Sequence, residues 1–351
     1  IVVVMKVNND SPLRRGWTTG ACAAAAVRAA LEQLWGEGEV SQVQITLPKG
    51  EKPIFPIAHR AVAEDWVEIG ITKDAGDDPD VTHGVLVIAR VASAKSGINF
   101  HAGSGVGIIT KPGLPIAVGE AAINPAPREM MRSQVIEMAN RYGKSPSVDI
   151  TIIIPGGREL TLKTWNPRLG IVGGLSVLGT TGIVRPFSCA AWIASIHRGI
   201  DVARAEGTLH VAGCTGSTSE RTVQSLYGLA DSAMLDMGDF AGGLMKYLAR
   251  NPVPRLTIGG GIGKITKLAQ GARDLHSGRS QVDFAALARV MGQPNLMKVN
   301  SALEAYSLAG PDMARWAAKE SLITCKSLLK ESSIDVDCVV IDRGGKILAR
   351  T

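Results

Sequence analysis

Short apolar runs alternate with longer helical patterns along the first half of the chain. Apolar residues recurring at helical spacing predict helices over 21–35 and 129–142. Alternating or β-branched runs predict a hairpin from 43–47 and 52–57, a strand pair from 67–72 and 85–91, and a strand at 148–154. Because these elements do not follow a strict βαβ order, we expect an α+β domain here.

The second half changes to a regular alternation. After a helical pattern over 188–206, apolar runs predict strands at 208–212, 232–237 and 255–258, and helices follow from 217, 239 and 264. This βαβαβ order is typical of an α/β domain with a Rossmann-like parallel sheet. Further helices are expected at 284–291, 300–309 and 313–329. A closing hairpin is expected from 336–341 and 346–349.

Length and composition limit the number of domains and the kinds of partner that the chain is expected to have. A chain of 351 residues with 45% hydrophobic and 20% charged residues is ordinary for a globular protein with two domains, which we place at 1–190 and 191–351. The net charge of +6 is spread along the chain without clustering with aromatics, so nucleic-acid binding is not expected. A modest positive net charge that is spread along the chain suits the binding of an acidic small molecule.

The five cysteines form no CxxC pair, which indicates reduced thiols in a cytoplasmic protein. The opening residues IVVVMKVNND do not resemble a signal peptide. No apolar run reaches the roughly 18 residues that a membrane span needs. The Ala- and Gly-rich faces would permit a tight homo-oligomer.

Two segments, 100–115 and 156–188, are rich in glycine. Glycine lets a loop turn through positive φ and bring backbone N–H groups close to a ligand. Nearby Lys and Arg indicate an anionic ligand. A flexible linker is the alternative, but the apolar residues within 156–188 favour a ligand-binding role. Neither the glycines after Phe100 nor GGGIGKIT at 259–266 fits GxGxxG or a P-loop.

Two polar motifs lie near the N-terminus. The sequence LRRGWTTG precedes the first helix, so Thr18 or Thr19 can cap it, and the helix start could hold an anion beside Arg14 and Arg15. The loop KDAGDDPDVTHG, residues 73–84, carries four Asp in seven residues. It does not match an EF-hand. A solvated acidic turn, a weak cation site, or a base acting with Lys73 and His83 remain open.

Ligands of parallel sheets bind at the carboxyl ends of the strands. Here three Gly-rich turns and two carboxylates follow the predicted strands, and a carboxylate after the second strand suits an adenosine ribose. We therefore expect a nucleotide or S-adenosyl group to contact Gly213, Thr215, Gly216, Asp236, Asp239, Gly261 and Gly263.

Six motifs together resemble the cobalt-precorrin-5B C(1)-methyltransferase family of the anaerobic cobalamin pathway. They are RRGWTTGACAAAA, KDAGDDPDVTHG, GSGVGIITKPGLP, GEAAINPAPR, GTTGIVRPFS and GKITKLAQGARDLHSGRSQVD, and they span about residues 13–285. The resemblance implies S-adenosylmethionine as methyl donor and a cobalt-containing tetrapyrrole as acceptor, methylated at ring carbon 1. The cobalt belongs to the substrate, so no protein metal site is expected.

The acceptor is a polyanion, and bidentate Arg–carboxylate pairs would orient it. The expected substrate contacts are Arg14, Arg15, Thr18, Thr19, Lys73, Lys111, Asn124, Arg128, Thr180, Thr181 and Arg185. For proton handling the candidates are Asp78, Asp80 and His83, with Asp78 favoured slightly over the others, Asp77 included. The alternatives are an NAD(P)-dependent oxidoreductase, against which the missing GxGxxG counts, and a non-enzymatic tetrapyrrole carrier.

Overall fold

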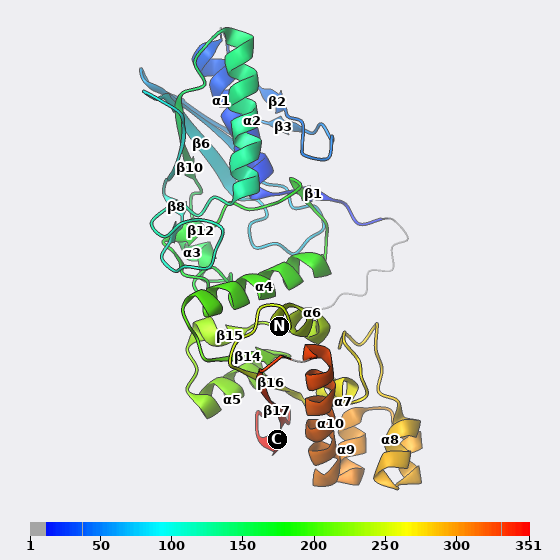
Figure 1. Ribbon diagram of the computed structural model, residues 1–351. Coiled ribbons are helices and arrows are strands. Elements are labelled where there is room, and N and C mark those ends of the chain that lie inside the picture. The colour runs from blue at the N-terminus through cyan, green and yellow to red at the C-terminus, as the bar shows by residue number, and fades with distance from the viewer. Residues whose placement is uncertain (1–11, 37, 331) are drawn as a thin grey trace. The chain divides into compact units, whose positions relative to one another are not determined.

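The computed structural model describes residues 12–36, 38–330 and 332–351 (Figure 1). The described chain divides into two compact units. Unit 1 contains the residues up to Thr110 and Pro115–Ser188, and unit 2 contains Lys111–Leu114 and Cys189–Thr351. The short segment 111–114 thus groups with unit 2, although the sequence placed it in the first domain.

The main sheet of unit 1 is mixed, with the strand order β4-β5-β6-β10-β7. β10 pairs antiparallel with β6 and parallel with β7. The predicted strand pair and the later strand are confirmed as β5, β6 and β10. The strand bounds are β4 His59–Val62, β5 Trp66–Thr72, β6 Leu86–Ser93, β7 Ile98–Ala102 and β10 Val148–Ile153.

Helices α1 (Thr19–Trp35) and α2 (Pro125–Tyr142) lie side by side in unit 1 (Figure 1). Residues Ala21–Ala26 of α1 are completely buried, and their small side chains let α2 and the sheet approach closely. Helix α2 begins at Pro125 rather than at the predicted 129. Proline is well tolerated in a first helical turn, where its missing N–H has no partner to lose.

Short strand pairs complete unit 1. The predicted hairpin is confirmed as β2 and β3, although its ladder is shorter than expected. The other pairs join segments that are distant in sequence: β1 with β13, β8 with β12 and β9 with β11. The bounds are β1 Gly16–Trp17, β2 Gln42–Gln44, β3 Ile54–Pro56, β8 Gly105–Val106, β9 Ile108–Ile109, α3 Gly157–Thr161, β11 Ile171–Val172, β12 Gly174–Leu175 and β13 Ile183–Val184.

The two Gly-rich segments of unit 1 meet backbone against backbone. A Cβ on Gly105 would overlap the carbonyl of Ile154, and Cβ atoms on Gly157 and Gly174 would overlap the backbone of Gly105. Gly105 also has φ +78°, a conformation that L residues adopt only at a cost. At these three positions glycine serves close packing of the chain on itself, whereas the sequence had favoured a ligand.

The sheet of unit 2 has the order β15-β14-β16-β17-β18. Neighbouring strands from β15 to β17 are parallel, and β18 returns antiparallel to β17. Figure 1 shows α5 on one side of the sheet and α7 and α10 on the other. The bounds are β14 His210–Cys214, α5 Ser217–Tyr227, β15 Met234–Leu235, β16 Arg255–Gly261, α7 Ile262–Ala269, α10 Pro311–Leu329, β17 Asp335–Ile341 and β18 Ile347–Arg350.

The predicted parallel strands and the closing hairpin are confirmed, although strand boundaries differ. β14 begins and ends two residues later than the predicted 208–212. The first two residues of the expected strand 232–237 lie in a 3₁₀ turn, η1 (Asp231–Ala233), and only Met234–Leu235 pair in the ladder. β16 runs three residues past the predicted 258, to Gly261, pairing with β17 throughout. The remaining bounds are α4 Cys189–Ala205, α6 Ala241–Leu248, α8 Phe284–Met291, η2 Pro294–Lys298 and α9 Ala302–Ala309.

The cysteines are free thiols, four of them buried and Cys189 exposed. Cys338 contacts Cys325, and this hydrogen bond, together with burial, raises the pKa of the Cys338 thiol. Both thiols lie in the core of unit 2. Among the residues that the structure describes, none of the helices combines the length and the apolar character needed to cross a membrane.

Replacing Gly105 with alanine should destabilise unit 1 strongly. The left-handed backbone costs an L residue about 1–2 kcal/mol, and the overlap with Ile154 adds about 1–3 kcal/mol. The matched control is Gly143→Ala at the end of α2, which has φ +62° and no atom within 4 Å of a built Cβ. Urea unfolding should show a clearly larger loss for Gly105→Ala. Equal losses would contradict the packing role.

Candidate active site

The polar side chains at the start of α1 form hydrogen bonds within the protein. Thr18 caps the helix, accepting a hydrogen bond at Oγ1 from the Ala21 N–H at 3.1 Å. The Thr19 hydroxyl accepts from the Leu178 N–H at 3.0 Å and donates to the Leu178 carbonyl at 3.3 Å. Thr18 and Thr19 are only 5% and 2% exposed. Both residues, expected at the substrate, fasten 178–182 to the helix, Thr18 by donating its backbone N–H to the Gly182 carbonyl at 3.0 Å.

Residues 12–17 pack closely against the acidic loop 73–84 at two glycines, one in each segment. A Cβ on Gly16 would overlap the backbone of Ala75, and one on Gly76 would overlap the carbonyl of Arg14. Arg14 forms a bidentate ion pair with Asp74, its Nη2 donating to Oδ1 at 2.9 Å. The hydrogen bond from Arg14 lowers the pKa of Asp74 to about 2.

The remaining acids of the loop point to different partners. Asp77 accepts the backbone N–H of Arg14 at 2.6 Å, and Asp78 Oδ1 accepts the N–H of Phe187 at 2.8 Å. Phe187 has φ +56°, so Asp78 supports a backbone conformation that is unfavourable for an L residue. Within the described residues, no group of three His, Cys, Asp or Glu side chains is arranged to hold a metal ion.

Lys73 and Asp80 form a buried ion pair. Lys73 is 1% exposed and its Nζ donates to Asp80 Oδ2 at 2.7 Å, while Thr82 donates to Oδ1 from both its N–H and its hydroxyl at 2.7 Å. Burial alone would raise the pKa of Asp80. The hydrogen bond and charge of Lys73, together with the two hydrogen bonds from Thr82, outweigh the effect of burial and lower the pKa. Lys73 and Asp80, expected at the substrate and in proton handling, are thus engaged with each other and with Thr82 inside the protein.

His83 is exposed and its ring is oriented by the loop. Nδ1 accepts a hydrogen bond from the Ala75 N–H at 3.1 Å, and since a backbone N–H can only donate, Nδ1 carries a lone pair. A neutral His83 therefore carries its proton on Nε2. In this arrangement it can donate a hydrogen bond from Nε2–H but has no free lone pair to accept one.

The other expected substrate contacts of unit 1 fall into two groups. Arg128 donates to the carbonyls of Ile123 and Ala121 and pairs with Glu120 at 2.7 Å, so its guanidinium holds the chain before α2. The exposed residues are Arg15, Thr180 and Arg185; Thr181 and Asn124 are half-buried. Lys111 belongs to unit 2, where it pairs with Glu206 at 2.9 Å.

In unit 2 the connections of the sheet change direction between β14 and β16. The chain leaves β14 toward β15 on one side, then returns past β14 to β16 on the other. Ligands of open α/β sheets bind at such a switch point, outside the carboxyl ends of the strands. There, Gly238 N–H donates to the Cys214 carbonyl at 3.0 Å and Thr215 N–H to the Gly259 carbonyl at 2.9 Å.

The glycines at this edge differ in what surrounds them. A Cβ on Gly213 would lie 2.5 Å from Leu244, so this glycine serves packing inside the unit rather than the expected ligand contact. Built Cβ atoms on Gly216 and Gly261 meet no atom within 4 Å, and one on Gly263 meets only Ala302 at 3.5 Å. The backbone at Gly216 and Gly261 is therefore open to a ligand.

Lys264 is a polar residue of this edge that the sequence did not single out. Its Nζ donates to the Thr215 carbonyl at 2.9 Å and lies 2.9 Å from Asp239 Oδ1, a charge contact without hydrogen-bond alignment. It therefore joins the turn after β14 to the loop after β15. The signal was the Lys in GGGIGK, which a failed P-loop match had set aside.

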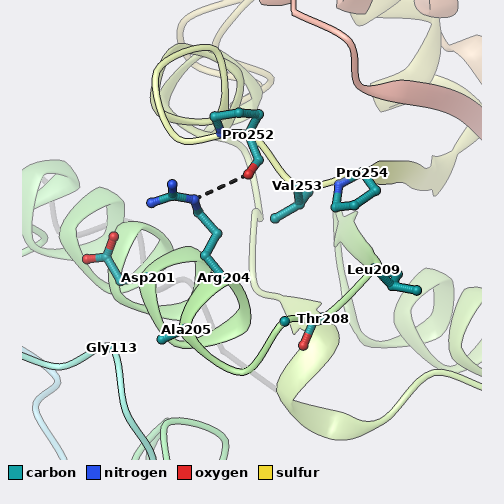
Figure 2. A pocket seen from close by; sticks show the side chains of 10 residues that line it. Gly113, Asp201, Arg204, Ala205, Thr208, Leu209, Pro252, Val253 and Pro254 are labelled. Carbon is teal, nitrogen blue, oxygen red and sulfur yellow. Dashed lines mark hydrogen bonds between the residues drawn. The ribbon is translucent and has the colours of Figure 1, made fainter.

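A cavity of unit 2 lies elsewhere. It has a volume of about 600 Å³ and is lined by residues that precede β14 and β16, among them Thr208, Leu209 and Pro254, at the amino edge of the sheet (Figure 2). Arg204 reaches into this region and donates to the Pro252 carbonyl at 3.2 Å. Since parallel sheets bind ligands at the opposite edge, this cavity is not our candidate for the cofactor.

The CbiD family model matches residues 6–186, more than half of the 351-residue chain. The chain belongs to the CbiD family. The family expected from the sequence motifs is thereby confirmed. The match ends close to the end of unit 1, and relatives of this CbiD-family chain extend the similarity across unit 2.

A Brucella anthropi protein is 54% identical over 358 aligned residues, covering 98% of this chain and 97% of its own. A Paramagnetospirillum magneticum protein is 51% identical, covering 97% and 98%. Both are named cobalt-precorrin-5B C(1)-methyltransferase. A solved Archaeoglobus fulgidus structure, titled cobalamin biosynthesis protein (cbiD), is 23% identical with a TM-score of 0.41 and 85% coverage of each chain.

The ion pair of this CbiD-family chain predicts a stability change. Asp80→Asn leaves the Lys73 ammonium buried without its counter-charge, which costs about 3–5 kcal/mol. Asp80 has a lowered pKa in the folded state, so its contribution is present above its unfolded pKa of about 4 and is lost as pH falls through the lower folded pKa.

The measurement is urea unfolding of wild type and Asp80→Asn at pH 7 and near pH 3, with the exposed turn residue variant Asp65→Asn as control. The difference from wild type should be large at pH 7 and smaller in acid. A variant as stable as Asp65→Asn at pH 7 would rule out the structural role of the pair.

Proposed function

We propose that this chain transfers the methyl group of S-adenosylmethionine to carbon 1 of cobalt-precorrin-5B, giving cobalt-precorrin-6A. The observation that carries the proposal is identity of 51–54% over nearly the whole chain to relatives bearing that enzyme name. Nothing in the similarity supports an NAD(P)-dependent oxidoreductase or a tetrapyrrole carrier. Free thiols fit the reducing cytoplasm in which we place the enzyme.

Unit 2 has the features that the methyl donor needs. Gly216 and Gly261 leave open backbone at the ends of β14 and β16, so an adenosyl group can approach the chain closely. The first N–H groups of α7, after Gly261, would favour the donor's carboxylate. Asp236, at the end of β15, is our candidate for the ribose hydroxyls, and Lys264 with Asp239 holds the two loops in place.

Unit 1 has the features that a polyanionic acceptor needs. Arg15 and Arg185 are exposed, and neither has an ion pair with another residue in the part of the chain that the structure describes. They lie on the segments joined by the β1–β13 pair, Gly16–Trp17 with Ile183–Val184. We propose that these two guanidinium groups bind carboxylates of the tetrapyrrole. Arg14 and Arg128, whose charges are paired, hold the surrounding loops.

The reaction requires little of the protein beyond orienting the methyl donor and the acceptor. The methyl group passes in line from a sulfonium to a nucleophilic ring carbon, and the chain contributes by positioning the acceptor and excluding water. For the proton, Asp78 is the candidate acceptor, because the Phe187 N–H occupies Oδ1 and Oδ2 stays available. His83 can donate a hydrogen bond from Nε2–H to an oxygen of the acceptor.

The first test is calorimetric titration with S-adenosylhomocysteine, with NADP as control. We expect saturable binding of the first and none of the second. The titration is repeated with a stable corrinoid analogue present, because the donor site could require the tetrapyrrole first. Binding of NADP instead would favour the oxidoreductase, and binding of the corrinoid with no S-adenosylhomocysteine in either titration would favour the carrier.

Asp78→Asn tests the proton acceptor. The amide keeps an oxygen to accept the Phe187 N–H, so the loop should stay in place, while the negative charge is lost. Turnover should fall by about 100-fold or more, the usual contribution of general acid–base catalysis. S-adenosylhomocysteine affinity should not change. Unchanged turnover would remove Asp78 from the mechanism and leave Asp78 as a support of the Phe187 backbone.

A further inference from the structure

Trp192 is the exposed tryptophan among the described residues. It lies in the first turn of α4, which contacts α6 and β15 in unit 2 (Figure 1), and 47% of its surface is accessible. A large aromatic side chain usually gains stability by burial, so an indole left this open is a candidate for ligand contact.

The exposed indole is nevertheless held in one orientation. Its Nε1–H donates to the Asp236 carbonyl at 2.8 Å. The backbone of Gly238 lies beneath the ring, since a Cβ built there would be 3.3 Å from the indole. The Phe240 ring braces it at a centroid distance of 6.1 Å and an angle of 56°. An aromatic ring that is fixed before binding loses little conformational entropy when a ligand stacks on it.

The position of the indole connects it to the switch point. Asp236, Gly238 and Phe240 belong to the loop that follows β15, and Gly238 N–H bonds to the carbonyl at the end of β14. Gly238 has φ +54°, so glycine lets this loop turn under the indole. The ring thus lies against the loop that carries Asp236, the residue proposed for the ribose, and contacts its backbone carbonyl.

We infer that Trp192, supported by Phe240, is the stacking surface for the adenine of the methyl donor. The inference rests on the proposed function, because it takes S-adenosylmethionine as the ligand of unit 2. A flat, neutral heteroaromatic base matches the exposed indole face, and its ribose then falls near Asp236. A purine stacks on an aromatic ring without requiring further base-specific contacts.

The test uses the intact chain, S-adenosylhomocysteine and 5′-methylthioadenosine, which keeps the base and ribose without the amino-acid part. Base–aromatic stacking is lost in Trp192→Ala, so the Kd for both compounds should rise by about 5- to 150-fold. Trp192→Phe keeps an aromatic face and should retain affinity within about threefold. In that variant the ligand-induced quenching of tryptophan fluorescence should largely disappear.

The matched control is Leu209→Ala, an exposed apolar residue at the other edge of the same sheet, 71% accessible, which should bind like wild type. If wild type binds S-adenosylhomocysteine and Trp192→Ala binds it equally well, the inference is overturned and the proposed function stands. If wild type binds neither compound, with or without the corrinoid analogue, the donor site fails and the inference with it. Weakened binding of the corrinoid alone would assign Trp192 to the acceptor and also overturn the inference.

Discussion

Unit 1 depends on places where two backbone segments lie so close that no side chain fits between them. Gly105, Gly157 and Gly174 form one such contact, and Gly16 and Gly76 form another with Ala75 and Arg14. Gly105 and Gly174 pair with each other in β8–β12, and Gly16 is the first residue of β1. The second contact places the acidic loop 73–84 against residues 14–16. Glycine is required at these positions by space, and at Gly105 and Gly76 by φ as well.

Each carboxylate of the acidic loop in unit 1 binds a different group. From the sequence, the four acids of the loop left open a solvated turn, a weak cation site or a base acting with Lys73 and His83. In the fold they diverge: one carboxylate pairs with Arg14, one with Lys73, and Asp77 and Asp78 hold backbone N–H groups. A buried ammonium such as Lys73 is stable only with its counter-charge, so Asp80 serves structure, and we propose Asp78 rather than Asp80 as the proton acceptor.

Unit 2 follows a different principle. Its parallel strands all end at one edge, so three loops from separate parts of the sequence come together there without any direct sequence signal. The hydrogen bond from Gly238 to Cys214 and the bridging Lys264 tie these loops into one surface. Trp192 comes to the same surface from α4. The donor site that we propose is thus made of backbone, one carboxylate and one indole, while the cavity lined by Thr208, Leu209 and Pro254 lies at the opposite edge.

The sequence by itself determined the regular elements, the parallel sheet of the second half and the family, because periodicity and long motifs are local properties of the chain. It also pointed to the Asp236–Asp239 loop, since strand order places carboxyl ends together. Only the tertiary structure decided the roles of individual residues. Thr18 and Thr19 are occupied by Leu178, and Lys73 by Asp80. Gly105 meets Ile154, and Trp192 lies on Gly238. Each of these partners is brought close by the fold, and burial and hydrogen-bond occupancy arise only after that approach.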